Sequence, residues 1–234
     1  MSIFGEVLSW FADPAHWEGS FGIPARLWEH VQMSVLATLA AAALALPVGI
    51  VLGHYGRGGN LAMNVSNVGR AVPSFAILVF AVQLFGIGAV PAFIALVALA
   101  VPPIITNAYV GMRDVDPELR EAARGLGMRE HVQVLRIEMP VALPVIMAGI
   151  RTAGVQVVAT ATLAAVVAWG GLGRYIVDGF AQRDFPQIFA GAILVAGLAF
   201  VAELGLAGLQ WLATPKPMRG RLLRTDATFK EAFG

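Results

Sequence analysis

The sequence predicts an all-α integral membrane protein, because of its composition, its long apolar stretches and the uneven placement of its basic residues. Of the 234 residues, 58% are hydrophobic and only 13% are charged, a balance outside the range of soluble globular domains. Ala, Val, Leu, Ile and Gly dominate the apolar stretches, as they do in packed membrane helices rather than in barrel strands of alternating polarity. About five transmembrane helices are therefore expected.

Five stretches are long enough to cross about 30 Å of hydrocarbon at ~1.5 Å of rise per residue. They cover residues 28–53, 61–86, 89–112, 140–168 and 187–213. The expected organisation is an extracytoplasmic segment at 1–27, a membrane domain at 28–213 and a cytoplasmic tail at 214–234.

The N-terminal segment has no Lys or Arg before Arg26. A cleaved signal peptide has a basic start, so we expect this segment to be retained. Trp10, Phe11 and Trp17 suit a short amphipathic helix along the membrane interface, and a disordered tail is the alternative.

The basic residues predict the orientation. With an odd number of spans, eleven fall on one side of the membrane: Arg57, the five arginines of the 113–136 loop and the five basic residues from Lys216 onward. The other side receives only three: Arg26, Arg174 and Arg183. Because basic residues gather in cytoplasmic loops, the N-terminus is expected outside the cell, and the long loop and the tail inside it.

A charged, glycine-punctuated segment, EAARGLGMREHVQVLRIEMP, lies between two apolar stretches at residues 121–140. Just before it, Asp116 can cap a helix that begins at Pro117 and continues through good helix formers. Gly125 and Gly127 then allow a sharp turn. A second helix, expected at 129–138, leads into the next span. The result is an elbow joined directly to a membrane helix.

The membrane domain lacks the usual energy-converting motifs. The only lysines of the whole sequence, Lys216 and Lys230, are not preceded by Gly, which excludes a P-loop ATPase. Glu203 is the only acidic residue well inside a predicted span, whereas ion-driven carriers commonly bury several. The absence of Cys excludes disulfides and thiolate metal sites. We expect no catalytic, cofactor or metal site, and an energy source supplied by a partner.

The spacing of Glu121, Ala122, Ala123, Gly127 and Pro140 resembles the EAA loop of permease subunits of binding-protein-dependent ABC importers. That loop is a pair of short cytoplasmic helices that docks into a groove of the ATPase subunit. The resemblance implies that six residues make the docking contacts: Glu121, Ala122, Ala123, Arg124, Gly125 and Gly127. A solvated loop between two membrane helices is the alternative.

Other motifs resemble the glycine betaine, carnitine and choline branch of these permeases, which serves the uptake of osmoprotectants. They are AVPS at 71–74, VPPIITN at 101–107, GIRTA at 149–153 and GGLG at 170–173. The resemblance implies a type I ABC importer permease fold in the cytoplasmic membrane of a bacterium or archaeon. It also implies a second permease subunit, identical or homologous, an extracytoplasmic substrate-binding protein, and two ATPase subunits that bind the ATP and Mg. No nucleic-acid partner is expected.

Small polar side chains inside the predicted spans are candidates for the lining of a passage: Ser74, Gln83, Thr106, Asn107, Gln156 and Thr160. Each is also suited to a hydrogen bond between helices. Arg151 and Glu203 lie at equal depth, ~15–17 Å into their spans at ~1.5 Å per residue. We expect them to pair, because an unpaired charge at that depth is costly.

Two other functions stay open at this point. One is the import of another small solute, such as an amino acid, by a permease of the same class. The other is an ATP-independent channel or secondary carrier, against which the resemblance to a docking loop argues.

Overall fold

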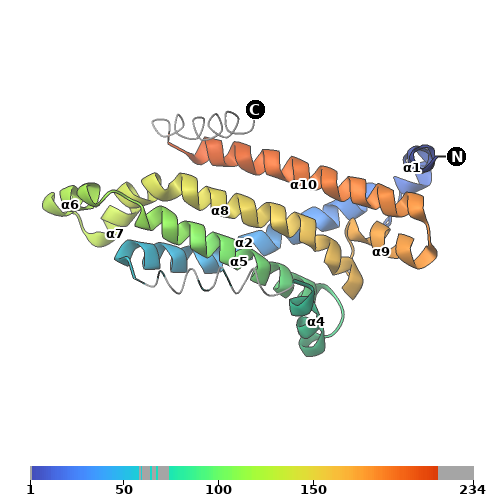
Figure 1. The fold of residues 1–234 in the computed structure, drawn as a ribbon, viewed down its shortest axis with the longest axis horizontal. Coiled ribbons are helices and arrows are strands. Elements are labelled where there is room, and N and C mark those ends of the chain that lie inside the picture. The colour runs from blue at the N-terminus through green and yellow to red at the C-terminus, as the bar shows by residue number, and fades with distance from the viewer. Residues whose placement is uncertain (1, 58, 60–63, 65–66, 68–73, 216–234) are drawn as a thin grey trace.

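In a computed structural model, the chain is a bundle of long helices (Figure 1). The structure describes residues 2–57, 59, 64, 67 and 74–215. Within these residues, four helical stretches are long and apolar enough to cross a membrane. They are α2 (Ile23–Tyr55), α5 (Ala89–Arg113), the continuous run Glu130–Val167 that contains α8 (Met139–Thr160), and α10 (Phe185–Ala213).

The short helices lie at the two ends of the bundle (Figure 1). At one end are α6 (Pro117–Gly125) and α7 (Glu130–Gln133). At the other end are α1 (Ile3–Ala12), followed by the 3-10 turn η1 (Pro14–His16), and α9 (Gly173–Gln182). These are the two ends that the arginine distribution assigns to opposite sides of a membrane.

The second predicted span, 61–86, is described mainly in its last part. There α4 (Ser74–Phe85) has 12 residues and packs against α5. Most of the stretch 61–73 lies outside the described residues, as does the predicted tail from residue 216 onward. The other four predicted spans correspond to α2, α5, α8 and α10.

The core contains a stripe of small residues spaced four apart on α2. Ala37, Ala41 and Ala45 are fully buried, and the buried Gly49 and Gly53 continue the same stripe. Because residues four apart share one face of an α-helix, this spacing lets the backbone of α2 approach its neighbours closely.

The glycines of this core mark points where two helix backbones nearly touch. A Cβ placed on Gly49 of α2 would lie 2.6 Å from the Cβ of Ala108 on α5. A Cβ placed on Gly149 of α8 would lie 2.6 Å from the Cβ of Asn107 on α5. The three helices α2, α5 and α8 therefore pack at a distance that only glycine allows at these points.

The fourth predicted span, 140–168, is not a single α-helix. α8 ends at Thr160 and is followed by the 3-10 helix η3 (Ala161–Val167). Ala168 then adopts a φ of 60°, in the left-handed region that non-glycine residues seldom occupy. The helix therefore tightens to a 3-10 helix, and the backbone then turns at Ala168, before the glycines of the 170–173 segment.

The second loop helix, expected at 129–138, is also divided. α7 covers only Glu130–Gln133, and η2 (Val134–Glu138) is a π-helix that runs directly into α8. The wider turn of a π-helix changes which side chains share a face, and here it lets Gln133 and Glu138 meet.

The N-terminal segment contains an ordered helix, which removes the alternative of a disordered tail for residues 3–12. α1 packs against α10, and its Trp10 is buried. The Trp10 ring meets the ring of Tyr175 on α9 edge to face, with 5.4 Å between the ring centroids. This contact ties α1 to the end of the bundle.

Candidate functional site

The first feature of interest is the helix–turn–helix formed by α6 and α7 at one end of the bundle (Figure 1). As predicted, α6 begins at Pro117, and an oxygen of the Asp116 side chain accepts a hydrogen bond from the Glu118 backbone N–H at 2.9 Å. The helix ends at Gly125, and Gly127 adopts a φ of 73°. No heavy atom outside the local chain lies within 4 Å of a Cβ built on Gly127, so the turn faces open space.

Most of the residues predicted to make docking contacts are exposed at this end. Glu121, Ala122, Arg124, Gly125 and Gly127 are all accessible. Ala123 differs, because it is buried and only 3% exposed. Its side chain therefore lies on the inner side of α6.

Two leucines that the sequence analysis did not single out are exposed on the same segment. Leu119 is 44% exposed and Leu126 is 82% exposed. Both leucines stand among the exposed charged side chains of the same helix–turn–helix. Their signal in the sequence was weak, because isolated leucines in a charged segment are common.

A buried polar cluster lies beneath this loop, and we call it the Glu138 cluster: Glu138, Gln133, His54 and Arg120. The Glu138 side chain is fully buried. One of its oxygens accepts from Nδ1 of His54 at 2.8 Å, and the other accepts from Nε2 of Gln133 at 2.7 Å. Nε of Arg120 lies 3.5 Å from the same oxygen as Gln133.

Arg120 extends the Glu138 cluster to two membrane helices. Its guanidinium donates to the backbone carbonyl of His54, at 3.4 Å, near the end of α2. It also donates to the backbone carbonyl of Met112, near the end of α5. The cluster therefore connects α6, α7 and η2 in the loop to α2 and α5 in the bundle.

Sequence reasoning missed the Glu138 cluster. The available signal was a carboxylate two positions before Pro140, at the start of an apolar helix, where burial without a cationic or hydrogen-bonding partner is costly. Its partners lie 84, 5 and 18 positions away in the chain. Because that pairing depends on the fold, no local pattern indicated it.

Two of the candidate passage residues come together in the structure. Ser74 of α4 and Thr160 of α8 line the same small hollow, which is otherwise walled by Leu and Ala side chains. Gln156 is exposed one turn before Thr160 on α8. Thr152, four residues earlier on the same face, is exposed as well. Polar Thr152 and Gln156 therefore form an outward-facing strip in the middle of a membrane helix.

The other three candidates have different surroundings. The Asn107 amide donates to the backbone carbonyl of Pro103 at 2.8 Å, and its side chain lies against Gly149. This places Asn107 in the contact between α5 and α8. Thr106 is half-buried on α5, and Gln83 is exposed on α4. The structure does not bring these three to the hollow that Ser74 and Thr160 share.

The structure brings Arg151 and Glu203 into direct contact. Nε of Arg151 on α8 donates to Oε1 of Glu203 on α10 at 2.8 Å, and a second guanidinium nitrogen donates to the same oxygen. Gln210 joins them, because its Oε1 accepts from Arg151 at 3.3 Å while its Nε2 donates to the Pro144 carbonyl at 2.9 Å. Sequence reasoning did not identify Gln210, which lies two turns beyond Glu203 on the same helix.

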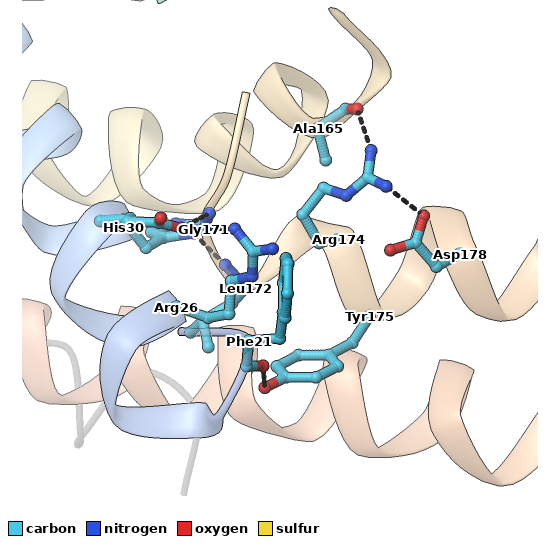
Figure 2. Close-up of polar contacts among 10 residues, drawn as sticks. Phe21, Arg26, His30, Ala165, Gly171, Leu172, Arg174, Tyr175 and Asp178 are labelled. Atoms are coloured by element: carbon cyan, nitrogen blue, oxygen red, sulfur yellow. Dashed lines mark hydrogen bonds and ion pairs between the residues drawn. The ribbon is translucent and has the colours of Figure 1, made fainter. Parts of the chain in front are cut away.

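The opposite end of the bundle contains a second polar arrangement, which we call the Glu29 clamp: Glu29, His30, Gly171 and Leu172. An oxygen of Glu29 accepts from the Gly171 backbone N–H at 2.7 Å. Nδ1 of His30 accepts from the Leu172 backbone N–H at 3.3 Å, as drawn in Figure 2. Nε2 of His30 donates to the carbonyl of Val158 at 2.8 Å. The clamp fixes the glycine-rich turn to the start of α2.

Neighbouring contacts hold α9 at this end (Figure 2). The Tyr175 hydroxyl donates to the carbonyl of Phe21 at 2.8 Å, and Arg174 joins the carbonyl of Ala165 to the carboxylate of Asp178. Burial raises the pKa of the Tyr175 phenol to about 12. The buried neutral phenol therefore serves as a stable donor at ordinary pH.

Among the residues that the structure describes, no three His, Asp or Glu side chains are grouped to hold a metal ion. The one buried carboxylate among these described residues, that of Glu138, instead accepts hydrogen bonds from His54 and Gln133 and lies beside Arg120. The described polar groups are therefore suited to holding helices together and to presenting a surface.

The family described as "binding-protein-dependent transport system inner membrane component" matches residues 45–210. The carnitine transport permease protein OpuCB of Listeria monocytogenes is 39% identical over 202 residues, which cover 86% of this chain and 93% of that protein. The choline transport system permease protein OpuBB of Bacillus subtilis is 39% identical over 194 residues, covering 83% and 89%. The osmoprotectant import permease protein OsmW of Salmonella typhimurium is 32% identical, covering 82% and 92%.

A chain in an inward-facing structure of the MetNI methionine ABC transporter has the same fold, with a TM-score of 0.70 and 21% identity over 80% of this chain and 94% of that one. This likeness confirms the predicted importer permease fold. The family match covers well over half of the sequence, and it includes the 113–139 loop and all of α5 and α8. The chain therefore belongs to the family of inner membrane components of binding-protein-dependent transport systems.

Proposed function

We propose that this chain is the membrane-spanning subunit of an ATP-driven importer for osmoprotectants, such as glycine betaine, choline or carnitine. The observation that carries the proposal is the exposed α6–α7 helix–turn–helix, seated on a buried polar cluster at one end of the bundle. The names of the relatives, which transport carnitine, choline and osmoprotectants, support the substrate class.

The energy would come from two ATPase subunits that bind ATP and Mg, one of which receives the α6–α7 surface. Glu121 and Arg124 offer charges, and Leu119 and Leu126 offer apolar contact area, on one exposed segment. Gly127 keeps the turn between the helices free of a side chain. The Leu126 side chain is 82% exposed, and a docked ATPase would cover it. This apolar area supports docking over a simple solvated loop.

A second permease subunit, identical or homologous, would complete the passage. The polar strip of Thr152 and Gln156 faces outward from α8 at membrane depth, where contact with lipid tails would leave the amide without partners. A passage between two subunits gives such side chains a wet surface. Ser74 and Thr160, around their shared hollow, are proposed to line the same route, and Thr106 and Gln83 remain candidates for it.

Substrate selection would lie with an extracytoplasmic binding protein. The candidate lining consists of hydroxyl and amide groups, which suits a zwitterion or a compact cation that must be released rather than held. The side of the membrane follows from the basic residues: α6 and α7 lie in the cytoplasm, while the N-terminus, α1 and α9 lie outside.

The test is reconstitution in liposomes with the companion ATPase and binding protein. We expect ATP-dependent uptake of labelled glycine betaine, choline or carnitine that stops when the binding protein is left out. Labelled methionine serves as the comparison substrate. Tight, saturable uptake without any binding protein, or uptake confined to methionine, would prove the assignment wrong.

A further inference from the structure

We propose that Glu138 is a positioning residue that passes the displacement of the docking loop to α2 and α5. The inference rests on the proposed docking of α6 and α7 to an ATPase. It goes further, because it identifies a buried side chain at which elements of the loop meet α2.

Donors from several helices converge on the Glu138 carboxylate. Glu138 receives donors from two other elements, His54 of α2 and Gln133 of α7, at 2.8 and 2.7 Å. Arg120 of α6 approaches it at 3.5 Å and also donates to backbone carbonyls of α2 and α5. The Glu138 carboxylate of η2 thus lies beside side chains from α6, α7 and the membrane helix α2.

The side chains of the Glu138 cluster are shielded from solvent. The side chains of Glu138, His54 and Arg120 are 0%, 8% and 13% exposed, and Gln133 is 1% exposed. Charge-assisted hydrogen bonds are strong where water is excluded, and a buried carboxylate left without partners is strongly disfavoured. The loop therefore cannot shift relative to α2 without losing these bonds, and a push on α6 or α7 must move α2 and α5 with it.

The backbone that leads to Glu138 is a π-helix. Gln133 and Glu138 are five residues apart, and in an α-helix of 3.6 residues per turn they would point ~140° away from each other. The π-helix at Val134–Glu138 widens the turn, and the two side chains hydrogen-bond. π-Bulges are frequent at functional sites. The irregularity of the backbone here has a specific result, which is to aim Glu138 and Gln133 at the same point.

The experiment measures substrate uptake and ATP hydrolysis by reconstituted complexes that contain the ATPase and the binding protein. The variants are Glu138→Gln, which removes the charge, and His54→Leu, which removes the donor. Two matched controls are His54→Asn, whose amide nitrogen can replace Nδ1, and Glu130→Gln. Glu130 lies in the same loop but is exposed, and it accepts only a 3.3 Å hydrogen bond from Tyr55 among the contacts described.

We expect Glu138→Gln and His54→Leu to bind the ATPase as the wild type does, because the exposed surface is unchanged. The number of substrate molecules imported per ATP hydrolysed should fall by about tenfold, the effect of losing one charge-assisted hydrogen bond. His54→Asn and Glu130→Gln should keep the wild-type ratio. If Glu138→Gln fails to accumulate in the membrane, the comparison of His54→Leu with His54→Asn tests the inference in its place.

An unchanged ratio in Glu138→Gln and His54→Leu would overturn the inference. A parallel loss of uptake and hydrolysis, at a constant ratio, would also overturn it, because it would show a role in folding alone. A wild-type chain that does not bind the ATPase would instead refute the docking function, and with it the inference built on that function.

Discussion

Nε of Arg151 donates to Oε1 of Glu203 at 2.8 Å, and this contact joins the middle of α8 to α10. Each partner brings a charge that hydrocarbon would not tolerate alone. Both side chains are still about one-third exposed, at 36% and 37%, so the pair lies on the flank of the bundle rather than in its core.

Replacement of one partner should therefore be worse than replacement of both. We expect Glu203→Gln to lower the amount of folded protein or its transport, with a loss of about 1.5–3 kcal/mol for a hydrogen bond to a charged group. Glu203→Gln combined with Arg151→Gln should recover part of the loss, because no lone cation remains. Thermal unfolding in detergent and uptake in liposomes measure the two effects. Losses that simply add in the double variant would show that the two residues act independently.

The docking surface can be tested at its turn. Gly127→Trp places a large side chain in open space at a residue whose φ is 73°, at a backbone cost of about 1–2 kcal/mol. We expect normal insertion in the membrane but weak co-purification of the ATPase. Gly127→Asn is the control, because Asn tolerates the left-handed region, and it should retain more of the ATPase. Equal co-purification by wild type and Gly127→Trp would contradict the docking role.

Charge at the docking surface can be tested separately. Glu121→Lys reverses an exposed charge on α6 and should weaken ATPase binding and uptake. Glu18→Lys makes the same change at an exposed position near the opposite end and should leave ATPase binding intact. Similar effects of the two variants would point to net charge rather than to a docking contact.

Topology follows from the positive-inside prediction. A reporter inserted after Gly173 should be read outside the cell, and one near Arg129 should be read in the cytoplasm. α9, which begins at Gly173, and α7, which follows Arg129, lie at opposite ends of the bundle (Figure 1). Reporters on the same side of the membrane would rule out the proposed orientation.

The hydrogen bond from Tyr175 to Phe21 predicts a dependence on alkaline pH. Burial raises the pKa of Tyr175 from 10.0 to about 12, so the folded protein holds this proton more tightly than the unfolded chain does. The stabilisation should be complete below pH 10 and should be lost as the pH rises toward about 12. Tyrosinate absorbance and thermal unfolding over this range measure it. In Tyr175→Phe, the late-titrating tyrosine and its share of the fall in stability should both disappear.

The long helices, the α6 start and the family were predictable because each has a local signal. Apolar runs of spanning length identify α2, α5 and α10, and the pair Asp116–Pro117 marks the first residue of α6. The contact between Arg151 and Glu203 could be anticipated because depth in a membrane is a one-dimensional quantity that sequence position supplies.

What the sequence did not reveal depends on three-dimensional register. The π-helix at Val134–Glu138 has no compositional mark, yet it determines where Glu138 points. The change from α8 to the 3-10 helix after Thr160 is likewise hidden in a run of Ala, Val and Leu. Ala123 is buried because its side of α6 packs against the rest of the protein. The sequence motif alone does not indicate which side of the helix that is.

The near-contact of backbones at Gly49 and Gly149 limits how this protein can change shape. A Cβ added to either glycine would lie only 2.6 Å from a Cβ of α5. Helices packed this closely have no room to slide or rotate past one another without first separating. α2, α5 and α8 should therefore travel as one rigid block through a transport cycle. The hinge must then fall outside that block, and α4, which packs against α5 at its margin, is a part whose position relative to the block can vary.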